Sequence, residues 1–302
     1  MDLKSKIILI AGPTSSGKTK FAIQLAKKIK GEIINADSMQ VYKELKILTA
    51  RPTVKDKEKI KHHLFGFKSV KDNFSTGQWL KLVVKKVKEI KKKNKAPILV
   101  GGTGLYFKAL TDGLVVIPKI PFKIRNKIRQ LQKKIGQKQF YKKLINIDPL
   151  IKGKIIETDI QRSVRAYEVK FYTKKSIVDW FKNTKPIFLD NEFIKIYIDF
   201  PREDLIKRIS KRTSKMFNNG VIKEVESYLK LKVKKDSSSH KVIGISEIEQ
   251  FLRNKTEIKD IIEKISIKTR QYAKRQATWA RGQMINWLKI KPKDLKKFLK
   301  KI

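Results

Sequence analysis

Residues 11–19 read AGPTSSGKT, and this stretch constrains the fold more than any other part of the chain. It matches the phosphate-binding pattern G-x-x-x-x-G-K-[ST], with Gly12 at its start and Gly17, Lys18 and Thr19 at its end. The β-branched run at 7–10 predicts a buried strand, and apolar residues at helical spacing over 21–29 predict a helix. Such a strand, loop and helix aim backbone N–H groups at an anion. We therefore predict a phosphate site at the end of the first strand.

Further strands and helices are predicted in alternation after this loop. Strand patterns cover 32–36, 96–100 and 193–200, and helical patterns cover 79–92 and begin again at 105 and 201. Alternation at this spacing is typical of a parallel sheet covered by helices. The fold class expected is α/β, with a P-loop NTPase-like core.

The pattern changes in the middle of the chain. Pro118 and Pro121 interrupt it, and helical spacing then dominates until about residue 185. We predict that 1–113 form the first part of the core and 114–187 a helical insertion domain. The remaining part, 188–302, is expected to return to the core with a last strand and to end in C-terminal helices.

Composition excludes several kinds of site. The chain has 302 residues and no cysteine, so disulfides, thiolate metal sites and cysteine nucleophiles are ruled out. The first six residues are polar, and no apolar run approaches the roughly 18 residues of a membrane span. We expect no leader, no membrane contact, a cytoplasmic location and, by default, a monomer.

The net charge of +45 indicates an anionic partner. Such an excess attracts polyanions, of which nucleic acid is the commonest. Lysine is spread over nearly every predicted helix, so part of the excess is equally explained by composition. The arginines are fewer and more clustered, and they are the better guide to contacts.

The acidic residues favour group transfer over hydrolysis. The strand at 96–100 ends in Gly-Gly-Thr-Gly, without the acid that holds Mg²⁺ in many P-loop hydrolases. The well-placed carboxylate is Asp37, directly after the second strand, where it suits a general base. A helix N-cap is the alternative role for Asp37. Lys18 supplies a point charge and Thr19 a hydroxyl for Mg²⁺.

Six blocks of the chain together resemble one family. They are GPTSSGKT at 12–19, ADSMQVY at 36–42, HHL at 62–64, GGTGLYFKAL at 101–110, DIQRSVRAYEV at 159–169 and AKRQATWAR at 273–281. The chain thus resembles the tRNA dimethylallyltransferases, also called tRNA isopentenyltransferases. The resemblance implies transfer of a dimethylallyl group from dimethylallyl diphosphate to N6 of adenosine 37, beside the tRNA anticodon. It also implies Mg²⁺ as cofactor, and a loop that holds the prenyl donor in place of ATP.

The resemblance also assigns roles to individual residues. It implies Asp37, Lys18 and Arg212 as the catalytic group, with Arg212 facing the diphosphate. The donor diphosphate would be held by Gly12, Pro13, Thr14, Ser15, Ser16, Gly17, Lys18 and Thr19, with Thr19 also on Mg²⁺. The tRNA contacts implied are Asp37, Ser38, Met39, Gln40, Thr103, Arg125, Gln161, Arg162, Ser163, Val164 and Arg165.

Some of these residues have a structural interpretation that stays open. Thr103 also suits a helix cap, and Arg162 with Arg165 also suit a solvated face partnered by Glu168. We expect a helix to begin after Thr158, with Thr158 and Gln161 forming a capping box at its start. The buried face of that helix is expected to hold Ile160, Val164, Tyr167 and Phe171.

Other residues of these blocks are expected to be structural. We interpret His62 and His63 in this way, and Trp279 as a packing residue. Trp279 belongs to an aromatic and basic face with Lys268, Tyr272 and Arg275.

Two other functions remain possible at this point. A P-loop kinase for a nucleoside or another small metabolite shares the loop and the strand-end acid. A non-enzymatic RNA-binding protein needs only the charge, but it leaves Lys18, Thr19 and Asp37 without a role.

Overall fold

The computed structural model describes residue 3 and residues 5–58, 60–254 and 257–302. The polar start of the chain, where we expect no leader, lies partly outside them. The chain divides into two compact units. Unit 1 consists of Met1–Thr111 and Phe188–Ile302, and unit 2 of Asp112–Ile187.

Unit 1 is built on a parallel sheet of six strands in the order β3-β2-β4-β1-β5-β6. The parallel sheet predicted from the alternation of elements is therefore confirmed. Two of its strands, β3 and β6, are too short to show a period and were not predicted. The bounds are β1 Ile7–Ala11, β2 Glu32–Asn35, β3 His62–His63, β4 Pro97–Gly101, β5 Phe193–Ile198 and β6 Leu288–Ile290.

The first strand lies in the middle of the sheet. Leu9 of β1 is paired with Leu99 of β4 on one side and with Lys195 of β5 on the other. All residues of β1 are buried, as its continuous apolar pattern predicts. The loop that follows β1 therefore begins between the ends of two neighbouring strands, where ligands of parallel α/β sheets bind.

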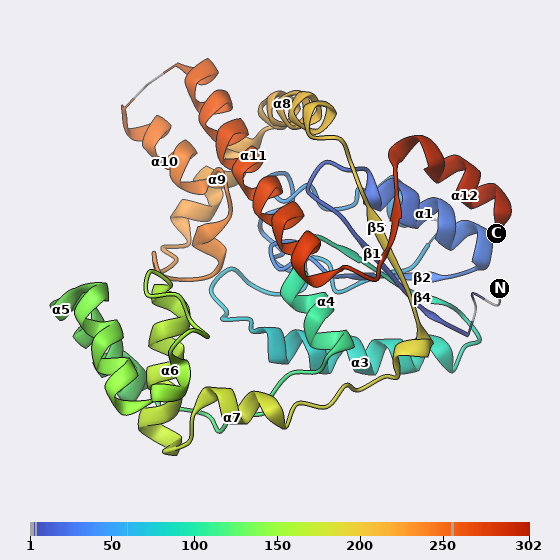
Figure 1. Cartoon of the computed structure of the whole chain (residues 1–302). Coiled ribbons are helices and arrows are strands. Elements are labelled where there is room, and N and C mark those ends of the chain that lie inside the picture. Colours follow the sequence, from blue (N-terminus) through green and yellow to red (C-terminus); the bar gives the residue numbers. More distant parts are fainter. Residues whose placement is uncertain (1–2, 4, 59, 255–256) are drawn as a thin grey trace. The chain divides into compact units, whose positions relative to one another are not determined.

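Helices cover both faces of the sheet. Figure 1 shows α1 and α12 on one face and α3 and α4 on the other. Ile8 and Ile10 of β1 share a core with Phe21 and Leu25 of α1, against which Phe298 of α12 packs. The helices of unit 1 are α1 Lys18–Ile29, α2 Val54–Lys57, α3 Thr76–Lys91, α4 Gly104–Thr111, α8 Arg202–Asn218, α9 Val221–Lys230, α10 Ile245–Asn254, α11 Ile258–Gln283 and α12 Leu295–Lys301, with short 3₁₀ turns at Asp190–Glu192, Ser239–Lys241 and Pro292–Asp294.

Unit 2 is helical and has its own small core. Leu144, Ala166, Val169 and Ile177 are buried together there. Gly136 interrupts the long helix α5 with a φ of 75°, a left-handed conformation that glycine adopts without strain. The helices of unit 2 are α5 Phe122–Ile147, α6 Ile160–Thr173 and α7 Ile177–Lys182, with a 3₁₀ turn at Pro149–Ile151.

Among the described helices of the whole chain, none is long and apolar enough to cross a membrane.

Candidate active site

The loop of residues 12–19, here called the phosphate loop, connects β1 to α1. The backbone of Ser15 and Gly17 is left-handed, with φ of 63° and 84°. At Gly12, a Cβ would lie only 3.0 Å from Ser16 Oγ and 3.3 Å from the Ile198 backbone oxygen, so the chain has little room for a side chain there. The result is a tight turn that leads directly into the N-terminus of α1, where backbone N–H groups are available to bind an anion.

Two cations belong to this loop. Lys18 Nζ donates a hydrogen bond to the Pro13 carbonyl at 2.9 Å. Burial lowers the pKa of Lys18 to about 8; Asp37 acts in the opposite direction and Arg212 in the same one. Arg212, from α8, donates to Thr14 Oγ1 at 2.7 Å. Burial also lowers the pKa of Arg212, while Asp37 raises it. Asp37 is thus close enough to act electrostatically on both cations.

Asp37 lies in a turn directly after β2. Its backbone N–H donates to Asn35 Oδ1 at 2.9 Å, and its own Oδ1 accepts the N–H of Met39 at 2.9 Å. No helix begins within the described residues 36–42, so the N-cap alternative for Asp37 is wrong. The side chain is half-buried and holds its own turn.

The loop of residues 101–104, here called the acceptor loop, is bound to the Asp37 turn. Thr103 Oγ1 accepts the N–H of Ser38 at 2.9 Å, and its hydroxyl lies 3.2 Å from Ser38 Oγ. A Cβ on Gly101 would lie 2.0 Å from the Ala36 carbonyl oxygen, so only glycine permits this approach. The Thr103 hydroxyl therefore serves the neighbouring turn, although α4 begins directly after it.

The other predicted residues of the Asp37 turn are tied into unit 1. Gln40 Nε2 donates to the carbonyl of Thr49 at 2.9 Å, and Met39 packs against the core around Val41. Ser38 is therefore the residue of this group whose backbone connects the turn to the acceptor loop.

Sequence reasoning missed Gln276 of α11. Its Oε1 accepts the N–H of Thr14 at 2.8 Å, and its Nε2 donates to the Gly102 carbonyl at 2.9 Å. It lies one helical turn after Tyr272, a residue of the aromatic and basic face predicted for this helix. The available signal was its position inside the block AKRQATWAR.

A cavity of about 240 Å³ lies between the phosphate loop and the acceptor loop. Gly12 and Thr103 line it, together with Tyr272 and Trp279 from α11. The Trp279 ring packs over Gly104, where a Cβ would lie 2.3 Å from its Cε3. Trp279 thus packs, as expected, and also forms a wall of this cavity.

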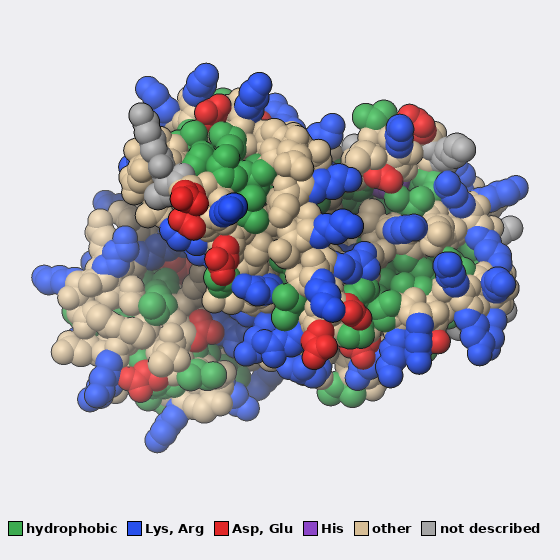
Figure 2. Space-filling view, turned by 90° about the horizontal axis from the view of Figure 1, so that it is seen from above, with side chains coloured by type: hydrophobic (Ala, Val, Ile, Leu, Met, Phe, Trp, Pro, Cys, Tyr) green, Lys and Arg blue, Asp and Glu red, His purple; other side chains and the backbone are tan. Residues whose placement is uncertain are grey.

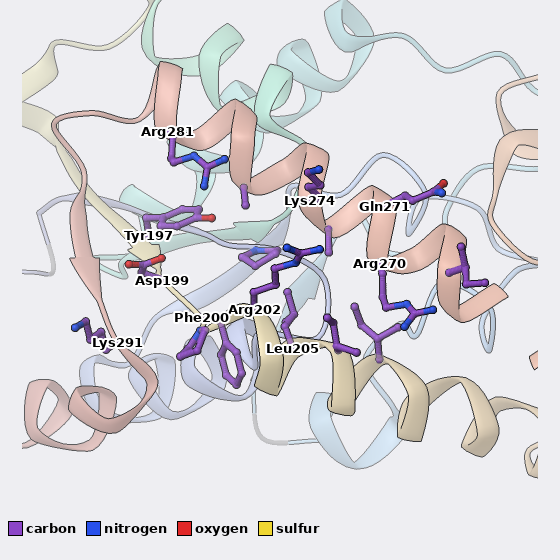
Figure 3. Close-up of a pocket in the computed structure, with 17 residues that line it drawn as sticks. Tyr197, Asp199, Phe200, Arg202, Leu205, Arg270, Gln271, Lys274, Arg281 and Lys291 are labelled. Carbon is purple, nitrogen blue, oxygen red and sulfur yellow. The ribbon is translucent and has the colours of Figure 1, made fainter. Parts of the chain in front are cut away.

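A larger cavity of about 770 Å³ lies on the other side of Pro13, between α8 and α11. Figure 3 shows Arg202 and Leu205 from α8 opposite Arg270 and Lys274 from α11. Its walls are mainly apolar and its rim is basic. Within the described part of the chain, Arg202, Arg270 and Lys274 have no ion-pair partner.

The paired histidines form β3 at the edge of the sheet. His63 Nε2 lies 2.7 Å from an oxygen of Glu32, whose other oxygen accepts from Lys95 at 3.0 Å. Glu32 is 2% exposed, and this pairing secures it against β3. Among the described residues, no group of three or more His, Cys, Asp or Glu side chains is arranged to hold a metal.

In unit 2, arginines surround one buried carboxylate. Glu168 is 2% exposed, and Arg125, Arg129 and Arg165 approach its oxygens at 3.5, 3.4 and 3.6 Å. Each of these arginines remains between 42% and 47% exposed. Arg165 does pair with Glu168, but that carboxylate is buried, so the pair is no solvated face. Arg162 pairs separately with Asp159 at 3.4 Å and is 69% exposed.

The start of α6 and part of its buried face differ from the sequence prediction, although Tyr167 does pack against the core of unit 2. The N-cap is Asp159, whose side chain accepts the N–H of Arg162, and not Thr158. Ile160 and Phe171 are exposed, because Ser163, Ala166 and Val169 face the core instead. Ser163, one of the predicted tRNA residues, is buried, and its hydroxyl lies 3.2 Å from Gln137 Nε2. Gln161 is exposed and Val164 half-buried.

Comparison with known proteins settles the family. The family model described as IPP transferase matches residues 40–283. A tRNA dimethylallyltransferase of Pelagibacter ubique is 59% identical over 302 residues, which is 100% of this chain and 96% of the relative. One from Rickettsia massiliae is 42% identical over 93% of this chain and 78% of the relative. This chain belongs to the IPP transferase family.

Solved structures agree with this membership. The tRNA Δ(2)-isopentenylpyrophosphate transferase of Staphylococcus epidermidis is 31% identical, with a TM-score of 0.69 over 98% of this chain and 96% of that one. A eukaryotic dimethylallyltransferase acting on tRNA is 29% identical, with a TM-score of 0.82 over 95% of this chain and 74% of that one. The family resemblance and the P-loop-like α/β core are confirmed. Family membership makes the chain a prenyltransferase enzyme, so a non-enzymatic RNA-binding protein is excluded.

Proposed function

We propose that this chain transfers the dimethylallyl group of dimethylallyl diphosphate to N6 of the adenosine at tRNA position 37. The observation that carries the proposal is the convergence of one carboxylate and two cations at the phosphate loop. Asp37 raises the pKa of both Lys18 and Arg212, so the three groups share one electrostatic environment. A proton acceptor beside cations suits a reaction that removes a proton and expels an anion.

The reaction requires a base for the acceptor amine. An exocyclic adenine amine is a weak nucleophile, and we propose that the Asp37 carboxylate takes a proton from N6 as it attacks. The N6 nitrogen bonds to C1 of the dimethylallyl group, and the bond from C1 to the diphosphate oxygen breaks with its electron pair on oxygen. Diphosphate leaves, and the proton from N6 resides on Asp37.

The growing charge on the leaving diphosphate is met by the phosphate loop. Lys18, Arg212 and backbone N–H groups at the start of α1 are fixed before the reaction, which makes them effective at stabilising developing charge. Arg212 reaches Thr14 and Ser15 from α8, and so belongs to the same site as the loop. We propose that Gly12 to Thr19 bind the donor diphosphate.

Mg²⁺ fits this donor set. Thr19 is the second residue of α1, so its hydroxyl lies in the first turn of the helix that follows the loop proposed to bind diphosphate. Mg²⁺ is commonly held by few protein groups together with substrate phosphates and water. When bound, it would neutralise charge on the diphosphate oxygens. We propose Thr19 as its protein ligand.

The acceptor is proposed to contact both units separately. In unit 1, a target base extruded from its stack would meet Asp37, Ser38 and the acceptor loop. In unit 2, Arg125, Arg162 and Arg165 retain exposed guanidinium surface that suits RNA phosphates. Since the donor and base residues all come from one chain, we propose that a monomer is sufficient; sedimentation under assay conditions tests this.

Incubation with labelled dimethylallyl diphosphate, Mg²⁺ and tRNA tests the function directly. We expect label on an anticodon stem-loop carrying adenosine at position 37, and none on the same stem-loop with guanosine there. A parallel reaction with γ-labelled ATP is informative, because the 770 Å³ cavity beside Pro13 has room for a nucleoside. Phosphate transfer without prenyl transfer would overturn the proposal in favour of a kinase.

A further inference from the structure

The side chain of Gln276 joins two loops that are far apart in the sequence. One end of its carboxamide accepts from the N–H of Thr14 in the phosphate loop, at 2.8 Å. The other end donates to the carbonyl of Gly102 in the acceptor loop, at 2.9 Å. The side chain thus forms a direct bridge between the loop proposed to hold the donor and the loop bound to the Asp37 turn.

The bridge requires the chemistry of a glutamine. One end must accept from an N–H and the other must donate to a carbonyl, and a carboxamide does both while a carboxylate cannot donate. Gly102 leaves space for the bridge, since a Cβ there would lie 2.2 Å from Gln276 Nε2. An alanine at 102 would push the amide away from the acceptor loop.

Neighbouring groups hold each end of the bridge. Thr14 is fixed on its other side by Arg212, whose Nη1 donates to its hydroxyl at 2.7 Å. Gly102 is followed by Thr103, which accepts the N–H of Ser38 beside Asp37. Tyr272 lies one turn before Gln276, and burial and the charge of Asp37 raise its pKa. Its hydroxyl therefore keeps its proton.

We propose that Gln276 is a positioning residue that couples binding of the diphosphate donor to binding of the acceptor nucleotide. A shift of the phosphate loop on diphosphate binding is passed through the carboxamide to Gly102, and from there to the base-binding turn. Linkage makes the effect reciprocal, so RNA must raise the affinity for diphosphate by the same factor. The inference rests on the proposed function for the identity of the two ligands.

The test measures this coupling without chemistry. Inorganic diphosphate with Mg²⁺ replaces the donor, and the ligand RNA is an anticodon stem-loop with adenosines at and beside position 37. The Kd of the RNA is measured with and without saturating diphosphate, and the ratio is the coupling factor. We expect a ratio of about 5 or more for the wild type, the lower end of typical couplings.

Gln276→Met is the main variant, because methionine has nearly the same length and fills the same space without either hydrogen bond. Its coupling ratio should fall to about 1, while each Kd measured alone changes little. Single-turnover transfer should slow by about 10- to 100-fold, as expected when reacting groups are slightly misplaced. Gln276→Glu keeps the acceptor for Thr14 but cannot donate to Gly102, and it should lose coupling too.

Gln271→Met is the matched control, since the Gln271 side chain is exposed on the same helix and makes no hydrogen bond among the described residues. It should keep the wild-type ratio. Thermal melts of all variants separate unfolding from lost coupling, and Gln276→Glu serves as the test if Gln276→Met does not fold. A Gln276→Met enzyme with undiminished coupling, or a wild type with no coupling, would overturn the inference. Neither result affects label transfer by the wild type, which tests the function itself.

Discussion

At the scale of single residues, the site is organised around the carboxylate of Asp37 and the two cations Lys18 and Arg212. The negative charge of Asp37 raises the pKa of both Lys18 and Arg212, against the effect of burial, which lowers both. Its carboxylate also accepts the N–H of Met39, which fixes the direction of the side chain. Substitution can therefore separate the proposed role of Asp37 as a base from its hydrogen bond to Met39, which holds the turn.

Asp37→Asn should fold, bind both substrates and lose turnover. Asparagine keeps the size and can still accept the Met39 N–H, but it cannot take a proton. We expect kcat to fall by about 10²- to 10⁴-fold, the usual contribution of general-base catalysis. Single-turnover prenyl transfer and RNA affinity are the measurements, with Asp37→Ala as a companion that also loses the turn bond. Near-wild-type turnover by Asp37→Asn would remove Asp37 as the base.

Lys18 predicts a dependence of diphosphate binding on pH. Its pKa is lowered from 10.5 to about 8, so the folded protein loses this charge as the pH rises through about 8. Between the two values the unfolded chain binds more protons, so this group contributes increasing stability as the pH rises. The same loss of charge weakens attraction to diphosphate.

The comparison of wild type with Lys18→Met isolates this effect, because the ionisation of diphosphate itself is common to both. The ratio of their Kd values for Mg²⁺-diphosphate should shrink roughly tenfold between about pH 7 and about pH 9. Titration calorimetry at several pH values measures it. A ratio that does not vary with pH would show that Lys18 does not change its charge over this range.

At the scale of elements, α6 shows how a buried carboxylate arranges exposed arginines. Glu168 faces the core of unit 2, and the guanidinium groups of Arg125, Arg129 and Arg165 gather over it. Only one negative charge opposes them, so the cluster keeps a net positive charge on its outer side. Such a cluster is suited to phosphate groups of RNA.

Arg162→Ala combined with Arg165→Ala should weaken tRNA binding by roughly 1–3 kcal/mol. Affinity for Mg²⁺-diphosphate should hardly change, because the phosphate loop belongs to unit 1. Lys133→Ala with Lys134→Ala removes the same charge from exposed positions of α5 and serves as the control. Filter binding at several salt concentrations measures the loss, and an effect no larger than that of the control would place these arginines on an idle surface.

At the scale of the whole molecule, the excess of positive charge is broadly distributed. Figure 2 shows Lys and Arg side chains over much of the face in view, with fewer Asp and Glu among them. This distribution suits attraction to a polyanion of any sequence, and it carries no information on the choice of substrate.

Dimethylallyl diphosphate with Mg²⁺ should protect the whole chain against thermal unfolding far more than ATP does. A ligand at a hundredfold excess over its Kd stabilises by about 2.7 kcal/mol. Thermal melts with each ligand at matched concentration make the comparison, and inorganic diphosphate distinguishes the head group from the prenyl tail. Stronger protection by ATP would indicate that a nucleotide is the preferred ligand.

Features that depend on local backbone geometry can be read from the sequence alone. The phosphate loop is fixed by glycines and by an apolar strand and helix on either side, all within residues 7–29, so its pattern is readable without the fold. The same holds for the long strands and for Asp37 at a strand end. β3 and β6 are not predicted, because strands of two and three residues are too short to show a period and form only by pairing with neighbouring strands.

Contacts between residues far apart in the sequence are visible only in the folded chain. Arg212 reaches Thr14 across 198 residues and Gln276 reaches it across 262, and neither contact leaves a periodic signal. The buried face of α6 was predicted only in part: Tyr167 packs against the core of unit 2, but Ile160 and Phe171 are exposed. The charged Glu168 lies inside instead, where arginines from two helices compensate its charge. Apolar periodicity assumes that charges face water. It fails where partners far along the chain supply the opposite charge, and only the folded chain shows where those partners are.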